Sequence, residues 1–319
     1  MPGAKPRGYP VQAFMNKPIE NLISRAGSII LDKEEQIKLA LACFLAKGHL
    51  LIEDIPGIGK TTLAQTLARL MNLDFQRIQC TNDLLPGDIL GVSVYEKNPG
   101  RFVFHPGPVF AQAVLVDEIN RAAPKTQSGL LEVMAEGQVT LDRERHVLPS
   151  PFFVMATQNP QEQAGTYPLP ESQLDRFLMC ISLGYPGRAA EIELLKGRDR
   201  KELLSSLSSS LTTAESLMLR EDVRKIHAAE PVLNYIRDIL EYSREQHSFL
   251  TGLSPRAGLD LLHCAKSWAY IHSRDFLLPE DVQAVFSAVT GHRLQLKQDL
   301  SSGDKTTELT SLLHNVPIP

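Results

Sequence analysis

The stretch "EDIPGIGKTT" (residues 53–62) follows a short apolar run and precedes a helical pattern. It fits the phosphate-binding pattern G-x-x-x-x-G-K-[ST] at Gly59, Lys60 and Thr61, whereas Asp54 stands at the first glycine position. A glycine-rich turn between a strand and a helix presents backbone amides and the positive end of the helix dipole to an anion. The stretch therefore predicts a phosphate-binding loop within an α/β domain.

Each residue of this loop has an expected contact. Gly57 and Gly59 let the backbone turn its amides towards phosphate oxygens, because no Cβ stands in the way. Lys60 would reach the β- and γ-phosphates, and the Thr61 hydroxyl would bind Mg²⁺. We expect ATP and Mg²⁺ as ligands, with the nucleotide bound by Pro56, Gly57, Ile58, Gly59, Lys60, Thr61 and Thr62.

Short apolar runs alternate with helical patterns over the first half of the chain. A run such as "AVLVD" has no polar alternation, which is typical of strands buried on both faces of a parallel sheet. Alternating strands and helices indicate an α/β fold with a mostly parallel sheet. The expected strands are 49–53, 75–79, 113–117, 152–157 and 177–183.

Helix boundaries also have signals in this half. Asp32 and Glu35 form a plausible capping box for a helix that runs through Ala46, and Gly48 can end it. Further helices are expected at 60–71 and 125–135.

Acidic and amide side chains follow two of the expected strands. Asp117 and Glu118 come at the end of "AVLVD", and Asn159 follows the strand "FFVMAT". Next to a phosphate-binding loop, Asp117 would hold Mg²⁺ through water and Glu118 would activate the attacking water. Asn159 would sense the γ-phosphate, although an Asn-Pro turn explains this residue as well.

Two insertions interrupt the alternation, and the character of the chain changes after Gly184. Residues 89–106 read as a hairpin turning at Asn98-Pro99-Gly100, and 137–149 as a second hairpin. A polar stretch at 205–213 predicts a flexible linker, and the rest is mostly helical. The helices include one opened by Ser254 and Pro255 and one opened by Pro279. We expect an N-terminal extension at 1–20, an α/β domain at 21–184 and a small helical domain at 185–319.

Composition narrows the class of protein. The 319 residues carry a net charge of −4, which gives no electrostatic reason to expect a nucleic-acid partner. The four cysteines form no C-x-x-C pair, so free thiols are expected rather than a zinc site. No apolar run approaches the roughly 18 residues of a membrane span, and no signal peptide is evident. A cytoplasmic protein is expected.

Several motifs together resemble one family. "PGIGKT", "LVDEINR", "ATQNP", "LDRF" and "SPRA" are similar to motifs of the AAA+ ATPases. The long stretches "FVFHPGPVFAQAVLVDEINRAAPKTQSGLLEVMAEGQVTLD" and "FFVMATQNPQEQAGTYPLPESQLDRFLM" resemble the MoxR family in particular. An acid at the position of Asp54 is usual in that family. One departure is Ile30-Leu31-Asp32-Lys33, where similar proteins often read V-V-G-Q. The resemblance implies that Ile30 and Leu31 pack on the adenine.

The resemblance also assigns roles to arginines and hairpins. The hairpins would be the helix-2 insert (about 89–105) and the pre-sensor-1 hairpin (about 138–148). Arg176 of "LDRF" falls where an arginine finger reaches the γ-phosphate of the next subunit, unless it merely pairs with Asp175. Arg256 of "SPRA" falls at the second sensor, unless it merely pairs with Asp260. Arg121 has no assigned role, since a surface ion pair explains it equally well.

The implied function is that of an ATP-hydrolysing chaperone. Family members form rings, usually hexamers, and help to assemble, activate or insert metal into a protein client, commonly with a partner that carries a von Willebrand factor A domain. Two alternatives stay open. One is the ATPase subunit of a magnesium chelatase, and the other is a DNA-tracking motor like the minichromosome-maintenance helicases. The second hairpin mixes acidic and basic residues and offers no basic stripe for DNA.

Overall fold

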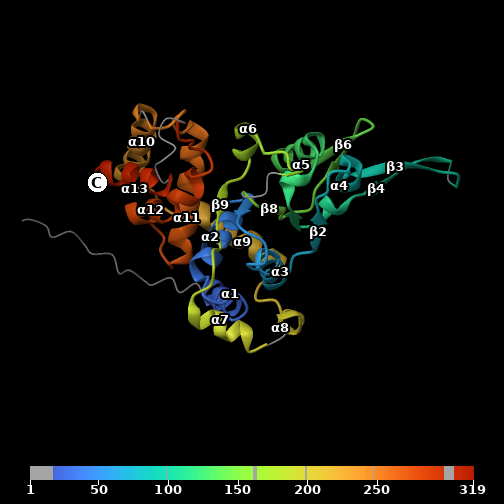
Figure 1. The fold of residues 1–319 in the computed structure, drawn as a ribbon, viewed down its shortest axis with the longest axis horizontal. Coiled ribbons are helices and arrows are strands. Elements are labelled where there is room, and N and C mark those ends of the chain that lie inside the picture. Colours follow the sequence, from blue (N-terminus) through green and yellow to red (C-terminus); the bar gives the residue numbers. More distant parts are fainter. Residues whose placement is uncertain (1–16, 99, 161–163, 198–199, 247, 298–304) are drawn as a thin grey trace, which may run out of the picture.

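The computed structural model describes residues 17–98, 100–160, 164–197, 200–246, 248–297 and 305–319. A five-stranded parallel sheet lies at its centre, in the strand order β2-β5-β8-β1-β9 (Figure 1). All five expected strands are confirmed, as are the α/β class and the parallel sheet. Their bounds are β1 (Leu50–Glu53), β2 (Phe75–Gln79), β5 (Ala113–Asp117), β8 (Phe153–Gln158) and β9 (Met179–Ile181).

Helices cover both faces of this sheet. Successive strand residues alternate between two buried clusters, so that Leu115 faces one and Val116 faces the other. This explains why "AVLVD" is apolar throughout. The first cluster is closed by α1 (Lys17–Gly27), α2 (Glu34–Leu45) and α3 (Lys60–Leu70), and the second by α4 (Pro86–Leu90) and α5 (Pro124–Glu136).

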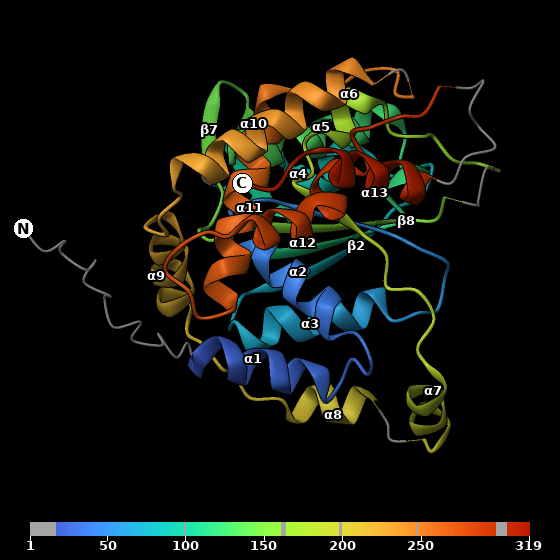
Figure 2. The same cartoon turned by 90° about the vertical axis from the view of Figure 1, so that its left-hand side faces the viewer.

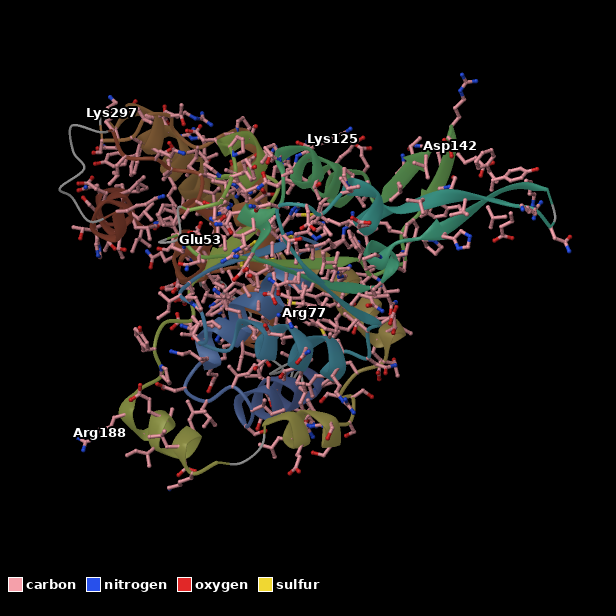
Figure 3. All side chains as sticks on the ribbon, turned by 45° about the vertical axis from the view of Figure 1, so that its right-hand side comes forward. Glu53, Arg77, Lys125, Asp142, Arg188 and Lys297 are labelled. Atoms are coloured by element: carbon pink, nitrogen blue, oxygen red, sulfur yellow. The ribbon has the colours of Figure 1, made fainter. Side chains whose placement is uncertain are left out.

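Both expected hairpins are confirmed. The first joins β3 (Gly91–Glu96) to β4 (Arg101–Pro106), and the second joins β6 (Gln138–Leu141) to β7 (Glu144–Val147). The first projects far from the body of the molecule (Figures 1 and 3). Its expected turn includes Pro99, which lies outside the described residues. Tyr95 and Phe102 pair edge-to-face on the projecting part and are largely exposed.

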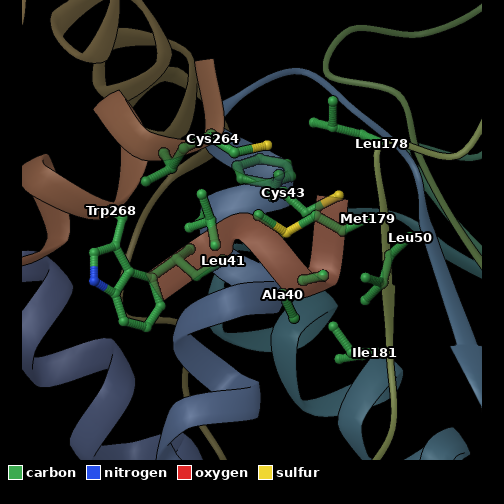
Figure 4. Packing of buried hydrophobic residues seen from close by; sticks show 14 of the residues in the cluster. Ala40, Leu41, Cys43, Leu50, Leu178, Met179, Ile181, Cys264 and Trp268 are labelled. Atoms are coloured by element: carbon green, nitrogen blue, oxygen red, sulfur yellow. The ribbon is translucent and has the colours of Figure 1, made fainter. Parts of the chain in front are cut away.

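The rest of the chain is helical. Helices α10 to α13 form a bundle on α2, and Figure 4 shows Cys264 and Trp268 of α11 beside Leu41 and Cys43 of α2. The first cluster therefore continues from the sheet into this bundle. The helices are α6 (Glu171–Leu174), α7 (Arg188–Leu195), α8 (Arg200–Ser206), α9 (Thr213–Arg224), α10 (Glu230–Glu245), α11 (Pro255–Ile271), α12 (Pro279–Thr290) and α13 (Lys305–Asn315).

The expected domain boundary after Gly184 lies between β9 and α7. Residues 1–16 of the expected N-terminal extension lie outside the described residues, and α1 spans the boundary at residue 20. Helices α7 and α8 lie near α1, apart from the α10–α13 bundle (Figures 1 and 2). None of the described helices is long and apolar enough to cross a membrane.

The expected capping box at the start of α2 is wrong. The helix begins at Glu34 after Lys33, and no side chain caps it. Asp32 adopts a left-handed backbone (φ 59°), and its carboxylate accepts a hydrogen bond from the Gly187 amide instead. At the other end, Lys47 rather than Gly48 takes the left-handed conformation.

The expected flexible linker is also wrong, because the stretch is tied to two helices. Arg25 of α1 donates to the Ser208 carbonyl at 2.7 Å and to the Ser210 hydroxyl at 2.8 Å. Arg69 of α3 donates to the Leu207 carbonyl at 2.7 Å. The polar sequence serves to present carbonyls and hydroxyls to these guanidinium groups.

Candidate nucleotide-binding site

A cavity of about 360 Å³ opens where β1, β5 and β8 end. Polar side chains from the loop, from the end of β5 and from β2 and β8 converge on it. Carboxyl ends of neighbouring parallel strands meet at one edge of a sheet, and ligands of open α/β sheets bind there. The cavity, called the phosphate pocket below, is lined by Pro56, Gly57, Gly59, Lys60, Thr61, Thr62, Arg77, Gln79, Asp117, Glu118, Thr157 and Asn159.

The loop has the backbone that its glycines predict. Gly57 and Gly59 have φ values of +85° and +97°, and an added Cβ would meet no atom within 4 Å at either position. These glycines are thus required by conformation, and the space beside them is open to a ligand. Helix α3 starts at Lys60, so its N-terminal amides face the same space.

Lys60 is oriented by the loop itself. Its ammonium group donates to the carbonyls of Asp54, at 2.5 Å, and of Ile55, at 3.2 Å. Partial burial lowers the pKa of Lys60, while the charges of Asp54, Asp117 and Glu118 oppose that shift. A partly desolvated cation between carbonyls and carboxylates is well suited to bind phosphate.

Asp117 is nearly buried, with 6% of its surface exposed. One carboxylate oxygen accepts from the Thr157 hydroxyl at 3.0 Å, and the other lies 3.5 Å from the Thr61 hydroxyl. Among the described residues there is no cluster of three or more His, Cys, Asp or Glu side chains that could hold a metal. One hydroxyl and one carboxylate are nevertheless the oxygen ligands that Mg²⁺ takes when phosphates and water complete its shell.

Glu118 has a left-handed backbone (φ 57°, ψ 51°), which is uncommon for a residue with a side chain. Its amide donates to the Thr157 hydroxyl at 2.9 Å. Its carboxylate accepts from the Gln79 amide at 3.2 Å and pairs with Arg121 at 3.0 Å. The strained backbone places the carboxylate at the mouth of the pocket instead of leaving it to continue the strand direction.

Sequence reasoning missed Thr157, Gln79 and Arg77. Arg77 donates to the Asp117 carboxylate at 2.7 Å and to Gln79 at 2.9 Å. All three side chains come from strands that flank β5. The available signal was the polar content of "FQRIQ", which is high for a strand that pairs with the buried β5, in register up to Asp117.

The residues expected to contact the base lie beside the loop. Ile30 and Leu31 line a small cavity of about 30 Å³ together with Ile58, Gly59 and Thr62. The structure thus brings the expected base-contacting segment together with the expected loop. The remaining lining residues are Lys33, Pro186 and Leu194.

Arg176 and Arg256 lie elsewhere. Among the described residues, those lining the phosphate pocket include neither arginine. Arg176 donates to the Leu131 carbonyl at 3.0 Å, and the exposed Arg256 lies 3.8 Å from the Asp175 carboxylate. The sequence offered Asp175 as a local partner for Arg176 and Asp260 as one for Arg256. In the structure, both aspartates bind another arginine.

That further arginine is Arg293, which follows α12 and was missed by sequence reasoning. Its guanidinium pairs with Asp175 at 2.9 Å and with Asp260 at 2.6 Å, and only 6% of its side chain is exposed. Arg293 therefore joins the "LDRF" segment to the helical bundle. We use the name Asp175 cluster for the set Asp175, Arg176, Arg256, Asp260 and Arg293.

Comparison with known proteins agrees with this geometry. Residues 49–179 match the model of the ATPase family associated with various cellular activities (AAA), and residues 241–311 match the AAA lid domain. A crystal structure of a proposed ATPase from Cytophaga hutchinsonii superposes with a TM-score of 0.87 at 36% identity and covers 95% of both chains. Fold, loop and lid together define an AAA+ ATPase with a helical lid.

The curated relatives identify the family within that class. The chain is 36% identical to the chaperone MoxR1 of Mycobacterium tuberculosis, covering 99% of this chain and 86% of MoxR1. It is 41% identical to the uncharacterised protein YeaC of Bacillus subtilis, over 89% and 87% of the two chains. The protein MoxR of Paracoccus denitrificans is 30% identical over 84% of this chain and 86% of its own. This chain belongs to the MoxR family of AAA+ ATPases.

Proposed function

We propose that this protein binds and hydrolyses ATP with Mg²⁺. The observation that carries the proposal is the convergence of Lys60, Thr61, Asp117, Glu118 and Asn159 on one pocket at the carboxyl edge of the sheet. These residues come from three separate segments of the chain. Any one of these residues could be present only to stabilise the fold, but that would not explain why all five line the same cavity.

Each side chain has a task in hydrolysis. Lys60 and the amides at the start of α3 bind the phosphates, and Asn159 contacts the γ-phosphate and the water. Glu118 orients and deprotonates that water, for which its position at the mouth of the pocket is suited. Mg²⁺, held by Thr61 and through water by Asp117, would neutralise charge on the phosphates.

We further propose that the working form is a ring of six chains, in which Arg176 acts on the ATP of the next subunit. The separation of the Asp175 cluster from the phosphate pocket supports this proposal. An arginine that serves its own site would line that site, whereas a finger for a neighbour must face outwards. Arg256 would act as the second sensor, and its exposure suits contact with a neighbour.

The ring would act as a chaperone in the cytoplasm, where it remodels a protein client together with a partner carrying a von Willebrand factor A domain. Its relative in M. tuberculosis is named a chaperone. The exposed Tyr95 and Phe102 on the projecting hairpin provide apolar surface on which a client could bind.

The two alternatives have less support. A homologue of the minichromosome-maintenance proteins from Methanopyrus kandleri shares the fold, with a TM-score of 0.59, but is only 17% identical. That likeness concerns the fold alone. The relatives named above favour a MoxR role over a DNA motor or a magnesium-chelatase subunit.

The site is tested by two substitutions, one expected to abolish ATP binding and one expected to keep it. Lys60→Ala should abolish tight ATP binding, because the charge that balances the phosphates is lost. Glu118→Gln should bind ATP but not hydrolyse it. Binding of a fluorescent ATP analogue and release of phosphate are measured, with and without duplex DNA. Wild-type turnover by both variants would refute the site, and strong stimulation by DNA would favour the motor.

Assembly and client binding are tested with Glu118→Gln as a trap. Light scattering should give a mass near six chains with Mg-ATP and less without it, because nucleotide at a subunit seam links binding to association. A particle that stays monomeric at micromolar concentration with saturating Mg-ATP would refute the ring. ATP-dependent capture by the trap, with Lys60→Ala as the control, then identifies the client.

A further inference from the structure

A six-residue segment (182–187), called the strap below, leads from β9 to α7 (Figure 1). At its start it binds Asp54. One Asp54 carboxylate oxygen accepts from the Ser182 hydroxyl at 2.8 Å and from the amides of Leu183 and Gly184, each at 2.7 Å. The Asp54 carboxylate therefore points towards the strap.

The strap is held at its other end by the segment that precedes α2. The Asp32 carboxylate accepts from the Gly187 amide at 2.8 Å. The neighbouring Lys33 ammonium donates to the Tyr185 carbonyl at 2.8 Å. The strap is thus bound at both ends, by two segments that the sequence places at the nucleotide.

The two aspartates each stand where a sequence pattern has glycine. Asp54 stands at the first glycine position of the phosphate-binding pattern, and Asp32 aligns with the glycine of V-V-G-Q. Asp32 even keeps the left-handed backbone (φ 59°) that suits glycine. At both positions, then, a side chain that ends in a carboxylate stands where glycine has only a hydrogen atom, and both carboxylates bind amides of the same strap.

The strap also borders the expected base site. Its residue Pro186 lines the small cavity with Ile30 and Leu31, and Leu194 of α7 lines the same cavity. A base bound there would contact the strap and α7 on one side and the loop on the other. Displacing the strap would therefore open that side of the base site.

The ionised state of Asp54 suits this contact. Burial acts to raise the pKa of Asp54, but hydrogen bonds from Gly184, Ser182, Ile55 and Leu183 outweigh it and hold the pKa below the usual value. The carboxylate is therefore ionised at neutral pH and accepts charge-assisted hydrogen bonds, which are stronger than neutral ones.

We propose that Asp54 and Asp32 are positioning residues that latch the strap, and with it α7, to the nucleotide pocket, and so slow the release of nucleotide. The proposal rests on the proposed ATP binding. It assigns a purpose to the aspartate that replaces the first glycine of the loop.

Two substitutions, Asp54→Gly and Asp32→Gly, restore glycine at the two positions. Glycine suits the left-handed backbone of Asp32. Asp54→Asn and Asp32→Asn, which keep the side chain and remove its charge, separate the lost carboxylate from the added freedom of a glycine backbone. Amide hydrogen exchange of the nucleotide-free chain should speed up at least about tenfold, because hydrogen bonds to a charged group are lost. The faster exchange is expected at residues 183–184 in Asp54→Gly and at 187 in Asp32→Gly. Release of a fluorescent ADP analogue should also be about tenfold faster in both.

Matched variants keep the test decisive. Asp74→Asn changes an exposed aspartate just before β2 and should alter neither measurement. If Asp54→Gly fails to fold, Asp54→Asn and Ser182→Ala take its place, with the smaller effect expected for Ser182→Ala.

The outcomes separate the latch from the proposed function. Unchanged exchange at the strap in the glycine variants, or faster exchange with unchanged release, would overturn the latch. If the wild type binds no ADP analogue, the proposed function fails and the effect on release fails with it, while exchange still tests the contacts. Tighter binding by Asp54→Gly would show that the aspartate is only a tolerated replacement.

Discussion

The phosphate pocket and the Asp175 cluster are built differently. In the pocket, side chains from the loop and from neighbouring strands converge on one cavity within the α/β domain. In the cluster, acids and arginines from the "LDRF" segment, α11 and the end of α12 bind one another across the junction with the lid. The pocket gathers the residues proposed to bind a nucleotide, whereas none of the arginines of the cluster is among the described residues that line it.

This difference fits the proposed division of work between the subunits of a ring. Residues that bind and cleave ATP can be assembled by one chain, because parallel strand ends bring them together. A residue that responds to ATP in a neighbour has to lie where the subunits meet. Arg293 of the lid binds Asp175, the residue next to Arg176, so movement of the lid would also move the proposed finger.

The largest expected effect is on turnover. Arg176→Ala should bind ATP nearly normally yet hydrolyse it about 10³–10⁵ times more slowly, because the transition state loses a neutralising charge. Mixed with Glu118→Gln in one ring, it should regain activity above the sum of the two variants. Some seams would then pair an intact Glu118 with an intact Arg176. Phosphate release from the mixture is the measurement.

The mixing experiment depends on exchange of subunits, which differently labelled chains can verify. If exchange occurs and activity does not rise, Arg176 serves its own chain and the comparison between the two regions fails. A role limited to its hydrogen bond with Leu131 predicts a loss of stability instead of a selective loss of turnover.

The next effect concerns the stability of the Asp175 cluster. Arg293→Ala should lower the free energy of unfolding by about 2–3 kcal/mol, since the partly buried carboxylates of Asp175 and Asp260 lose charge-assisted hydrogen bonds. Burial already raises the pKa of Asp260, and Arg293 opposes that shift. Denaturant unfolding followed by circular dichroism measures the change.

Arg237→Ala is the matched control. Arg237 pairs with Asp238 at 2.7 Å, but both side chains are exposed, so about 1 kcal/mol or less should be lost. Equal losses from the two variants would mean that the Asp175 cluster does not hold the lid more firmly than a surface ion pair.

The sequence predicted the phosphate pocket better than it predicted the Asp175 cluster. The pocket was largely predictable, because a short motif fixes the loop and an apolar strand followed by acid fixes Asp117 and Glu118. Their meeting at one edge follows from a parallel sheet. Thr157 was not predicted, since its contact with Asp117 depends on which strand lies next to β5.

The Asp175 cluster was predictable only in part. Arg176 and Arg256 stand in recognisable motifs, whereas Arg293 stands in none and binds Asp175 from far along the chain. Local rules also failed at Asp32, which suits a capping box but binds the distant Gly187 amide. At both residues the side chain binds a partner that is distant in sequence, and the local sequence alone does not identify that partner.

Acid should weaken the two regions through buried histidines. Burial lowers the pKa of His49, in the α/β domain, to about 4, and the pKa of His292, next to the Asp175 cluster, to about 3. Both values lie below the unfolded value of about 6.5, so the unfolded chain binds more protons as pH falls below that value. Stability should therefore be full above pH 6.5 and fall by about 2 kcal/mol per histidine between pH 7 and pH 5.

Denaturant midpoints at pH 7 and pH 5 test this expectation. His49→Gln and His292→Gln should each remove part of the difference, and the exposed His314→Gln should remove none. His292 donates to the Phe177 carbonyl, so its variant reports on the junction with the lid, while the His49 variant reports on the α/β domain. A pH response carried entirely by one histidine would show that only one region is sensitive to acid.

The smallest effect is expected at Arg77, the arginine that does lie in the phosphate pocket. Its guanidinium binds the Asp117 carboxylate oxygen that also lies 3.5 Å from the Thr61 hydroxyl, so it competes with Mg²⁺ for a ligand. About half of the Arg77 side chain is exposed, which limits the strength of the pair. Arg77→Gln should therefore lower the Mg²⁺ concentration for half-maximal binding of a fluorescent ATP analogue by only about three- to tenfold. Arg101→Gln, on the projecting hairpin, is the control and should change nothing. A higher Mg²⁺ requirement in Arg77→Gln would show that Arg77 binds the phosphates together with Lys60, and the pocket would then hold a second functional cation of its own.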